Sequence, residues 1–179
     1  MISRAHRRIK KPVEVRRAIA TDAAAICAVV RASILELCTA DHHGDSAILA
    51  RWLANKTPED VARWIANPAN LDFVATNDGI ILGAGCVNIS GEIILNYVSP
   101  AARFCGVSSI LLATMEQAAS QANNTHCALE STSTAHRFYL ERGYRDVGVP
   151  GTKHGLVTYP MTKTLTECFG TTFMVSETR

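Results

Sequence analysis

A strand, a short turn and a helix that opens on glycine are predicted between residues 93 and 109, where the chain reads IILNYVSPAARFCGVSS. The first backbone N–H groups of a helix have no intrahelical acceptor, and the positive end of the helix dipole adds to their attraction for anions. Phosphate is the usual ligand of such a helix end. The segment therefore predicts both a piece of the fold and a candidate anion site.

Two details of this segment support the anion site. Arg103 stands three residues before Gly106, where a guanidinium can pair with phosphate oxygens while glycine lets the backbone approach closely. The apolar residues that follow fall on one helical face, which leaves the first turn free: Val107, Ile110, Leu111, Met115, Ala118 and Ala122. Taken alone, the pattern also fits an ordinary strand-to-helix turn with a surface arginine.

The rest of the chain predicts alternating strands and helices. A helix is expected to follow the capping residues Thr21 and Asp22 and to end near Asp41, before a polar turn at 42–45. Further helices are expected at 46–56, 57–67, 106–121 and 134–142, and strands at 13–19, 72–78, 80–90, 92–98, 126–131, 144–149 and 156–162. The turn residues at 77–79 and 90–91 favour an antiparallel meander in the middle of the chain.

Composition favours one globular domain, since 179 residues with 47% hydrophobic content can bury a sizeable core. No apolar run is long enough for a transmembrane helix, and no secretory signal follows the charged start, so a cytoplasmic location and no membrane partner are expected. The six cysteines form no CxxC pair, which predicts small buried side chains and no metal site: Cys27, Cys38, Cys86, Cys105, Cys127 and Cys168.

Charge is uneven along the chain although the net charge is only +2. Seven of the 18 basic residues precede residue 18, which predicts a flexible basic arm over residues 1–12 ahead of a single domain at 13–165. Such an arm is more often a solvated tail than a nucleic-acid contact, and a nucleic-acid partner is not expected because interleaved aromatic residues are lacking. The apolar tail at 166–179 packs either on its own core or on a partner, so homodimerisation stays open.

Two linked motifs give the chain a family resemblance. The stretch YVSPAARFCGVS resembles the signature Arg/Gln-x-x-Gly-x-Gly/Ala, and AHRFYLERGY resembles Ala-x-x-Phe-Tyr-x-x-x-Gly-Phe/Tyr, both typical of the GCN5-related N-acetyltransferases, or GNAT family. The resemblance covers about residues 13–163 and is closest to bacterial single-domain members. It implies the GNAT fold, an α/β (α+β) fold in which about four helices flank a mixed, mostly antiparallel central sheet of six to seven strands.

The chain departs from these motifs at three positions. Ser108 replaces the last Gly or Ala of the first motif, Cys105 stands where many relatives carry a basic or small residue, and Thr132 stands where many carry Asn.

The resemblance implies acetyl-CoA as the acetyl-donor cosubstrate. Its pyrophosphate is expected at the backbone amides from Arg103 to Ser108, and its pantetheine along the strand near Tyr97 and Val98. The implied cofactor-binding residues are Tyr97, Val98, Arg103, Phe104, Cys105, Gly106, Val107, Ser108 and Ser109.

The chemistry expected from the resemblance is direct attack by a primary amine in a ternary complex. Tyr139 is the expected acid for the departing thiolate, and Glu92 is a candidate base that also fits a solvated strand end. Glu130 is a lesser candidate base, and His42 and His43 either act as bases or face solvent. A ping-pong route through Cys105 is not expected, because the family transfers acetyl directly.

The acceptor is the least constrained part of the prediction. Small amines, aminoacyl compounds and protein amines all fit, and Glu36, Asp41 and Asp45 are candidates for an acidic rim around a cationic amine. A non-catalytic module that binds acyl-CoA as a sensor is the alternative function.

Overall fold

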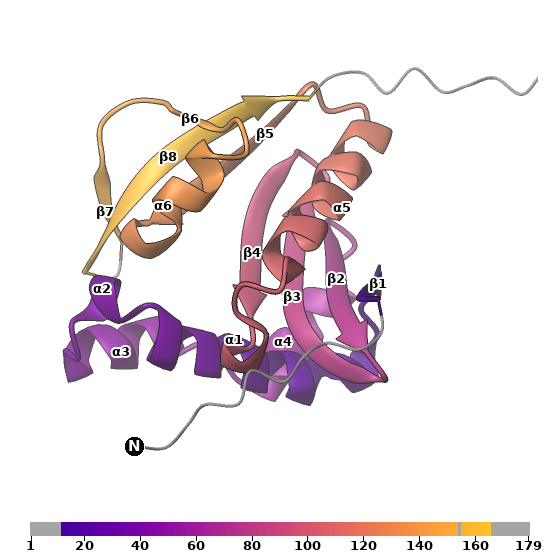
Figure 1. Ribbon diagram of the computed structural model, residues 1–179, viewed down its shortest axis with the longest axis horizontal. Helices are drawn as coiled ribbons and strands as arrows, with labels where there is room; N and C mark the ends of the chain where they lie inside the picture. Colours follow the sequence, from indigo (N-terminus) through magenta and orange to yellow (C-terminus); the bar gives the residue numbers. More distant parts are fainter. Residues whose placement is uncertain (1–11, 154, 166–179) are drawn as a thin grey trace, which may run out of the picture.

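A computed structural model describes residues 12–153 and 155–165 of the chain. These residues form one sheet of eight strands in the order β1-β2-β3-β4-β5-β8-β6, with β7 paired to β8 (Figure 1). The strands are β1 (Glu14–Arg17), β2 (Asn70–Asn77), β3 (Ile80–Asn88), β4 (Glu92–Val98), β5 (His126–Thr132), β6 (Arg145–Asp146), β7 (Gly151–Lys153) and β8 (Leu156–Thr164). All neighbouring strands are antiparallel except β4 and β5, so the predicted mixed, mostly antiparallel sheet is confirmed.

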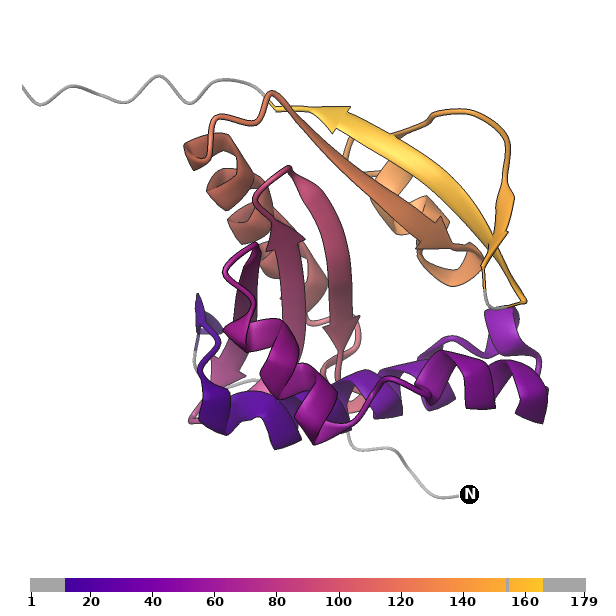
Figure 2. The ribbon, with the colours of Figure 1, turned by 180° about the vertical axis from the view of Figure 1, so that it is seen from behind.

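The parallel pair at the centre of the sheet is very short. β4 and β5 are paired only at Glu92 with Ala128 and at Ile93 with Leu129. Beyond these residues the two strands diverge, as both ribbon views show (Figures 1 and 2). The sheet therefore has two halves, β1–β4 and β5–β8, that are joined at one end and separated at the other.

Six α-helices cover this sheet: α1 (Ala23–Leu37), α2 (Thr39–His42), α3 (Ser46–Leu53), α4 (Pro58–Ala66), α5 (Val107–Gln121) and α6 (Ser133–Leu140). α1 and α4 pack on one face of the first half, α5 packs on the other face, and α6 packs on β5 and β8. None of the helices in the described part of the chain has the length and apolar character that a bilayer crossing needs.

Several expected elements have different bounds. The first helix was expected to run to Asp41, but it ends at Leu37, and a separate turn of helix follows Cys38. The strand expected at 144–149 is reduced to β6 at 145–146, because Gly148 has a φ of 88° and Pro150 follows it, and β7 at 151–153 is an additional strand. The separate turn of helix and the additional β7 give six α-helices and eight strands in the described residues, where the residues predicted five and seven and the family resemblance implied about four and six to seven. The basic arm and the C-terminal tail lie outside the described residues, apart from Pro12.

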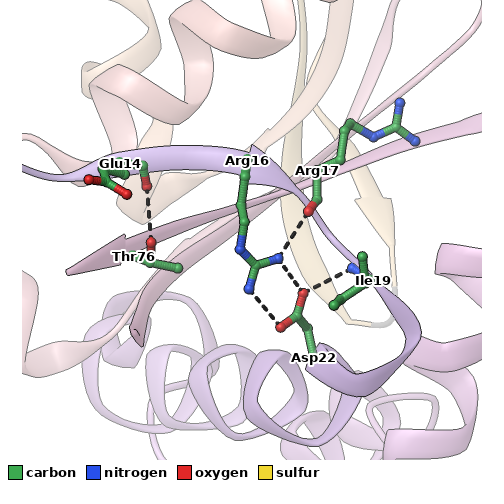
Figure 3. A network of polar contacts seen from close by, with 6 residues as sticks. All are labelled: Glu14, Arg16, Arg17, Ile19, Asp22 and Thr76. Atoms are coloured by element: carbon green, nitrogen blue, oxygen red, sulfur yellow. Dashed lines mark hydrogen bonds and ion pairs between the residues drawn. The ribbon is translucent and has the colours of Figure 1, made fainter. Parts of the chain in front are cut away.

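The entry into α1 is fixed by one ion pair (Figure 3). The Arg16 guanidinium on β1 donates to both carboxylate oxygens of Asp22, with Nη1–Oδ2 at 2.7 Å and Nη2–Oδ1 at 2.9 Å. The Asp22 carboxylate also accepts from the backbone N–H of Ile19 at 2.9 Å. Asp22 therefore ties the edge strand to the start of α1, and its hydrogen bonds to Arg16 lower its pKa.

We predict that Asp22→Asn lowers the free energy of unfolding by about 1 kcal/mol at pH 7, since a charged hydrogen bond is lost but Arg16 is partly solvated. The pKa of Asp22 is lowered from its ordinary value of 3.8, so this stabilisation is present above that pH and disappears as the pH falls through the folded-state pKa. Urea unfolding at pH 7 and pH 3 measures both effects. Glu14→Gln, on the same strand, is the control; an equal loss in both variants would contradict the assignment.

Candidate active site

The separation of β4 from β5 leaves backbone groups of β4 without a neighbouring strand. In the ladder with β3, Cys86 is opposite Leu95 and Val87 is opposite Ile93, so Ile94 is an extra residue in β4. Such a β-bulge bends its strand locally. The edge of β4 beyond Ile93 faces the divergence, where its N–H and C=O groups are available to a ligand.

A cavity of about 510 Å³ fills this divergence on the side of α5 and α6. We refer to it as the first cavity. Its walls are formed by β4, β5, the loop before α5, the first turn of α5 and α6, together with parts of α1 and α3. Eight of the nine predicted cofactor-binding residues line it: Tyr97, Val98, Arg103, Phe104, Gly106, Val107, Ser108 and Ser109. Cys105 is not among the lining residues and is exposed to solvent.

The N-terminus of α5 has the form expected of an anion site. Gly106 is its N-cap with a φ of 78°, in the left-handed region that glycine adopts readily, and no side chain caps the helix. For the backbone N–H groups of Gly106, Val107 and Ser108 the structure records no hydrogen-bond acceptor within the described chain. A side chain at Gly106 would point into open space, so the amides are accessible to a ligand.

Two arginines add positive charge to this helix end. The Arg103 guanidinium lies 4.6 Å from the centre of the Phe104 ring, and Phe104 itself is 87% exposed. Arg142 Nη2 donates to Ser109 Oγ at 2.6 Å, while its Nη1 donates to the backbone carbonyl of Phe138 at 3.0 Å. Arg142 is therefore held beside the first turn of α5 from the end of α6.

Arg142 and Asn96 also line the first cavity, and the sequence analysis missed both. Arg142 was detectable as the basic residue directly before Gly143 of the second motif. Asn96 Nδ2 donates to the Ser108 carbonyl at 3.3 Å, while its Oδ1 is buried without a hydrogen-bond partner. A buried acceptor of this kind calls for a donor from a ligand.

Tyr139 of α6 is buried in the wall of the first cavity. Its ring makes edge contacts with Phe138 and Tyr144, with centroid distances of 5.1 and 5.4 Å. Burial raises the pKa of Tyr139 to about 12, and the nearby polar side chain of Asn96 and the charge of Arg142 offset part of that rise. The phenol is therefore protonated at neutral pH and has the proton that a general acid needs.

Glu92 lies on the other side of the sheet. It lines a second cavity of about 440 Å³, which α3, α4 and the β7–β8 hairpin enclose with β4 and β5. Asn88 holds Glu92 through a side-chain hydrogen bond of 3.1 Å from Nδ2 to Oε2. The two cavities share seven lining residues at the divergence of β4 and β5: Trp52, Ile93, Ile94, Leu95, Tyr97, Glu130 and Thr132. Ligands can therefore reach the candidate site from both faces of the sheet, one through each cavity.

The comparison with known families identifies this arrangement. Residues 38–165 match the family described as Acetyltransferase (GNAT) domain. The chain belongs to the GNAT family. A comparison with curated protein sequences gave no match.

Solved structures show the same GNAT fold. A GCN5-related N-acetyltransferase from Rhodopseudomonas palustris is 23% identical, with a TM-score of 0.77 over 87% of this chain and 97% of that one. PaiA N-acetyltransferase from Thermoplasma acidophilum, solved in complex with coenzyme A, is 18% identical, with a TM-score of 0.73 over 86% and 99%. YncA from Salmonella typhimurium, solved with its cofactor acetyl-CoA, is 19% identical, with a TM-score of 0.67 over 88% and 96%.

The acidic rim that the sequence predicted is absent from both cavities of the GNAT domain. Asp41 is buried and its Oδ1 accepts from the Thr134 backbone N–H at 3.1 Å, at the start of α6. Asp45 caps α3 by accepting from the N–H groups of Ala47 and Ile48. Glu36 is exposed on α1 and lines neither cavity. Two of the three carboxylates therefore stabilise the N-terminal ends of helices. From the sequence alone, this role could not be told apart from ligand binding.

The candidate bases His42 and His43 also lie away from the two cavities, and most of the cysteines are buried. His42 is buried on α2 and its Nδ1 accepts from the Gly44 N–H at 3.0 Å, while His43 is exposed; neither residue lines the first or the second cavity. Four of the five described cysteines are buried, as predicted, and Cys105 is the exposed one. Within the described residues no group of His, Cys, Asp and Glu has the arrangement of a metal site.

The position of α5 depends on a close approach to β3. A Cβ on Gly83 would lie 2.7 Å from Val107 Cγ1 and 2.9 Å from Leu111 Cδ1. We predict that Gly83→Ala lowers the free energy of unfolding by about 1–3 kcal/mol, because the first turn of α5 must shift. Thermal or urea unfolding measures the change. Gly151→Ala is the control, since its Cβ would meet only Thr158 Oγ1 at 3.4 Å; similar losses in both variants would contradict the argument.

Proposed function

We propose that this GNAT domain is an N-acetyltransferase that moves an acetyl group from acetyl-CoA to a primary amine by direct attack in a ternary complex. The observation that carries the proposal is the first cavity, in which a free helix N-terminus, an unpaired strand edge and a buried tyrosine meet. The coenzyme A and acetyl-CoA complexes of two structural relatives add support.

The residues of the first cavity fit the chemical groups of acetyl-CoA. The amides of Gly106, Val107 and Ser108, with the guanidinium groups of Arg103 and Arg142, suit the negative pyrophosphate. The unpaired acceptor of Asn96 and the free edge of β4 suit the amide groups of pantetheine. When bound, acetyl-CoA supplies the acetyl group as a reactive thioester.

Proton transfer is assigned to groups on opposite sides of the β4–β5 divergence. An alkylamine has a pKa of about 10.4 and must lose a proton before it can act as a nucleophile at neutral pH. We assign Glu92, which lines the second cavity, as the base that removes this proton from the amine. Glu130 is the weaker candidate, because Lys153 Nζ already binds its carboxylate at 3.1 Å. Tyr139 holds the proton that the departing thiolate takes up.

We expect acetyl-CoA to bind with a Kd on the order of micromolar, which isothermal titration calorimetry measures. Gly106→Glu should abolish binding by placing a carboxylate at the helix end, and Arg142→Gln should weaken binding about tenfold through loss of a charged contact. Gly106→Ala is the matched control for backbone strain at this positive φ. Arg137→Gln, an exposed arginine on α6 outside both cavities, controls for net charge. Failure of the wild type to bind acetyl-CoA would contradict the proposal.

Tyr139→Phe should lower kcat about 100-fold or more with a panel of primary amines, because the thiolate then leaves without a proton. The Kd for acetyl-CoA should change less than about twofold, since the ring remains in the cavity wall. The raised pKa of Tyr139, about 12, further predicts no loss of its acid function between pH 7 and pH 10. Undiminished kcat would remove Tyr139 from the mechanism. Tight acetyl-CoA binding without turnover of any amine would favour the non-catalytic acyl-CoA-binding alternative.

A further inference from the structure

The second cavity is the side of the site from which an acceptor would approach, and its chemical lining differs from that of the first. Its lining includes the apolar side chains of Trp52, Trp64 and Leu156. It also includes the side-chain amides of Asn55, Asn67 and Asn70. Its charged residues are Glu92, Glu130, Lys56 and Lys153. A ligand in this cavity therefore meets both carboxylates and ammonium groups.

Three of these four charges already have a partner. Glu130 and Lys153 form an ion pair with a distance of 3.1 Å, and Glu92 accepts a hydrogen bond from Asn88. Lys56 differs, because no carboxylate of the described residues comes within ion-pairing distance of its Nζ. Asp60, the acid whose charge acts on Lys56, is bonded to Thr57 Oγ1 at 2.8 Å and to the Arg63 guanidinium.

The environment of Lys56 keeps its ammonium partly out of water. Nζ lies 5.3 Å from the centre of the Trp64 ring and donates to the side-chain oxygen of Asn55. Burial is the main effect that lowers the pKa of Lys56; the charge of Asp60 opposes this shift, and the nearby Lys153 charge adds to it. A half-buried cation that lacks an anionic partner is a group that a ligand's anion can stabilise.

The backbone at Lys56 is fixed in place by α1. Its carbonyl oxygen accepts hydrogen bonds from Arg31 Nη1 and from Cys27 Sγ, each at 3.1 Å. These contacts anchor the loop between α3 and α4, where Lys56 stands. The backbone that carries the Lys56 side chain is thus held in place, so a ligand that binds the ammonium does not have to order this loop.

We propose that the acceptor amine also carries a carboxylate, as an α-amino acid does, and that Lys56 is the residue that binds this carboxylate in the second cavity. The inference rests on the proposed function, since it names the acceptor class of the same site. The amine would lie toward Glu92 and the β4–β5 divergence, and the apolar walls would take a side chain. The acceptor is then a zwitterion, which narrows the range of small amines, aminoacyl compounds and protein amines that the sequence left open.

Direct binding tests this inference without the need for turnover. The full chain, with and without saturating coenzyme A, is titrated calorimetrically at pH 7 with L-leucine, L-glutamine, L-phenylalanine and L-lysine, and with the four corresponding C-terminal amides. We expect at least one acid to bind about tenfold or more tightly than its amide, because one charged contact distinguishes the two. Lys56→Gln should remove that preference, and Lys56→Arg should retain most of it.

Arg137→Gln controls for a change in net charge and should leave the preference for acids intact. Equal or tighter binding of the amides, failure of all four acids to bind, or an unchanged preference in Lys56→Gln would overturn the inference. Acetyl-CoA binding and acetyl transfer, measured separately, decide the proposed function. An enzyme that acetylates only the amides would refute the carboxylate requirement and leave the acetyltransferase proposal standing.

Discussion

The separation of β4 from β5 after two residue pairs is the constraint on which the rest of the site depends. Inside a sheet, a strand normally satisfies its backbone groups through both neighbours, and an unpaired edge is stable only where solvent or a ligand can take their place. Here the β-bulge at Ile94 and the divergence of the strands open such an edge in the middle of the molecule. Two cavities meet there, so the departure from regular pairing creates the site.

The two faces of this divergence carry different charged groups, and the roles that we propose for them follow from that difference. The side of α5 and α6 offers a free helix N-terminus with Arg103 and Arg142, which suits an anion such as pyrophosphate. The side of α3 and α4 offers Glu92 together with Lys56, which suits an amine that carries its own negative group. Tyr139, the proton donor that we propose, lies in the wall of the first cavity, and its burial raises the pKa of the phenol to about 12.

The candidate site could be predicted well where its residues are close in sequence. The loop from Arg103 to Ser109 is one continuous segment, so its motif located most of the first cavity, and the second motif located Tyr139. Arg142 and Asn96 were missed because their roles arise from contacts with Ser109 and Ser108 of another element. The acids proposed for an acidic rim line neither cavity, for a related reason: Asp41 and Asp45 accept hydrogen bonds from backbone amides at helix termini, and sequence order does not reveal which hydrogen bonds a carboxylate already makes.

By itself, the sequence determined the family, most of the order of the elements and the position of the candidate anion-binding turn, because hydrophobic periodicity, turn residues and short motifs are local properties of the chain. Only the tertiary structure decided where β4 and β5 part, since strand pairing is set by residues far apart in the sequence and by the helices packed on them. It also decided that Lys56, anchored by Arg31 and Cys27 of α1, lies in the cavity without an acidic partner. Charge compensation depends on distances in space, and a sequence does not contain them.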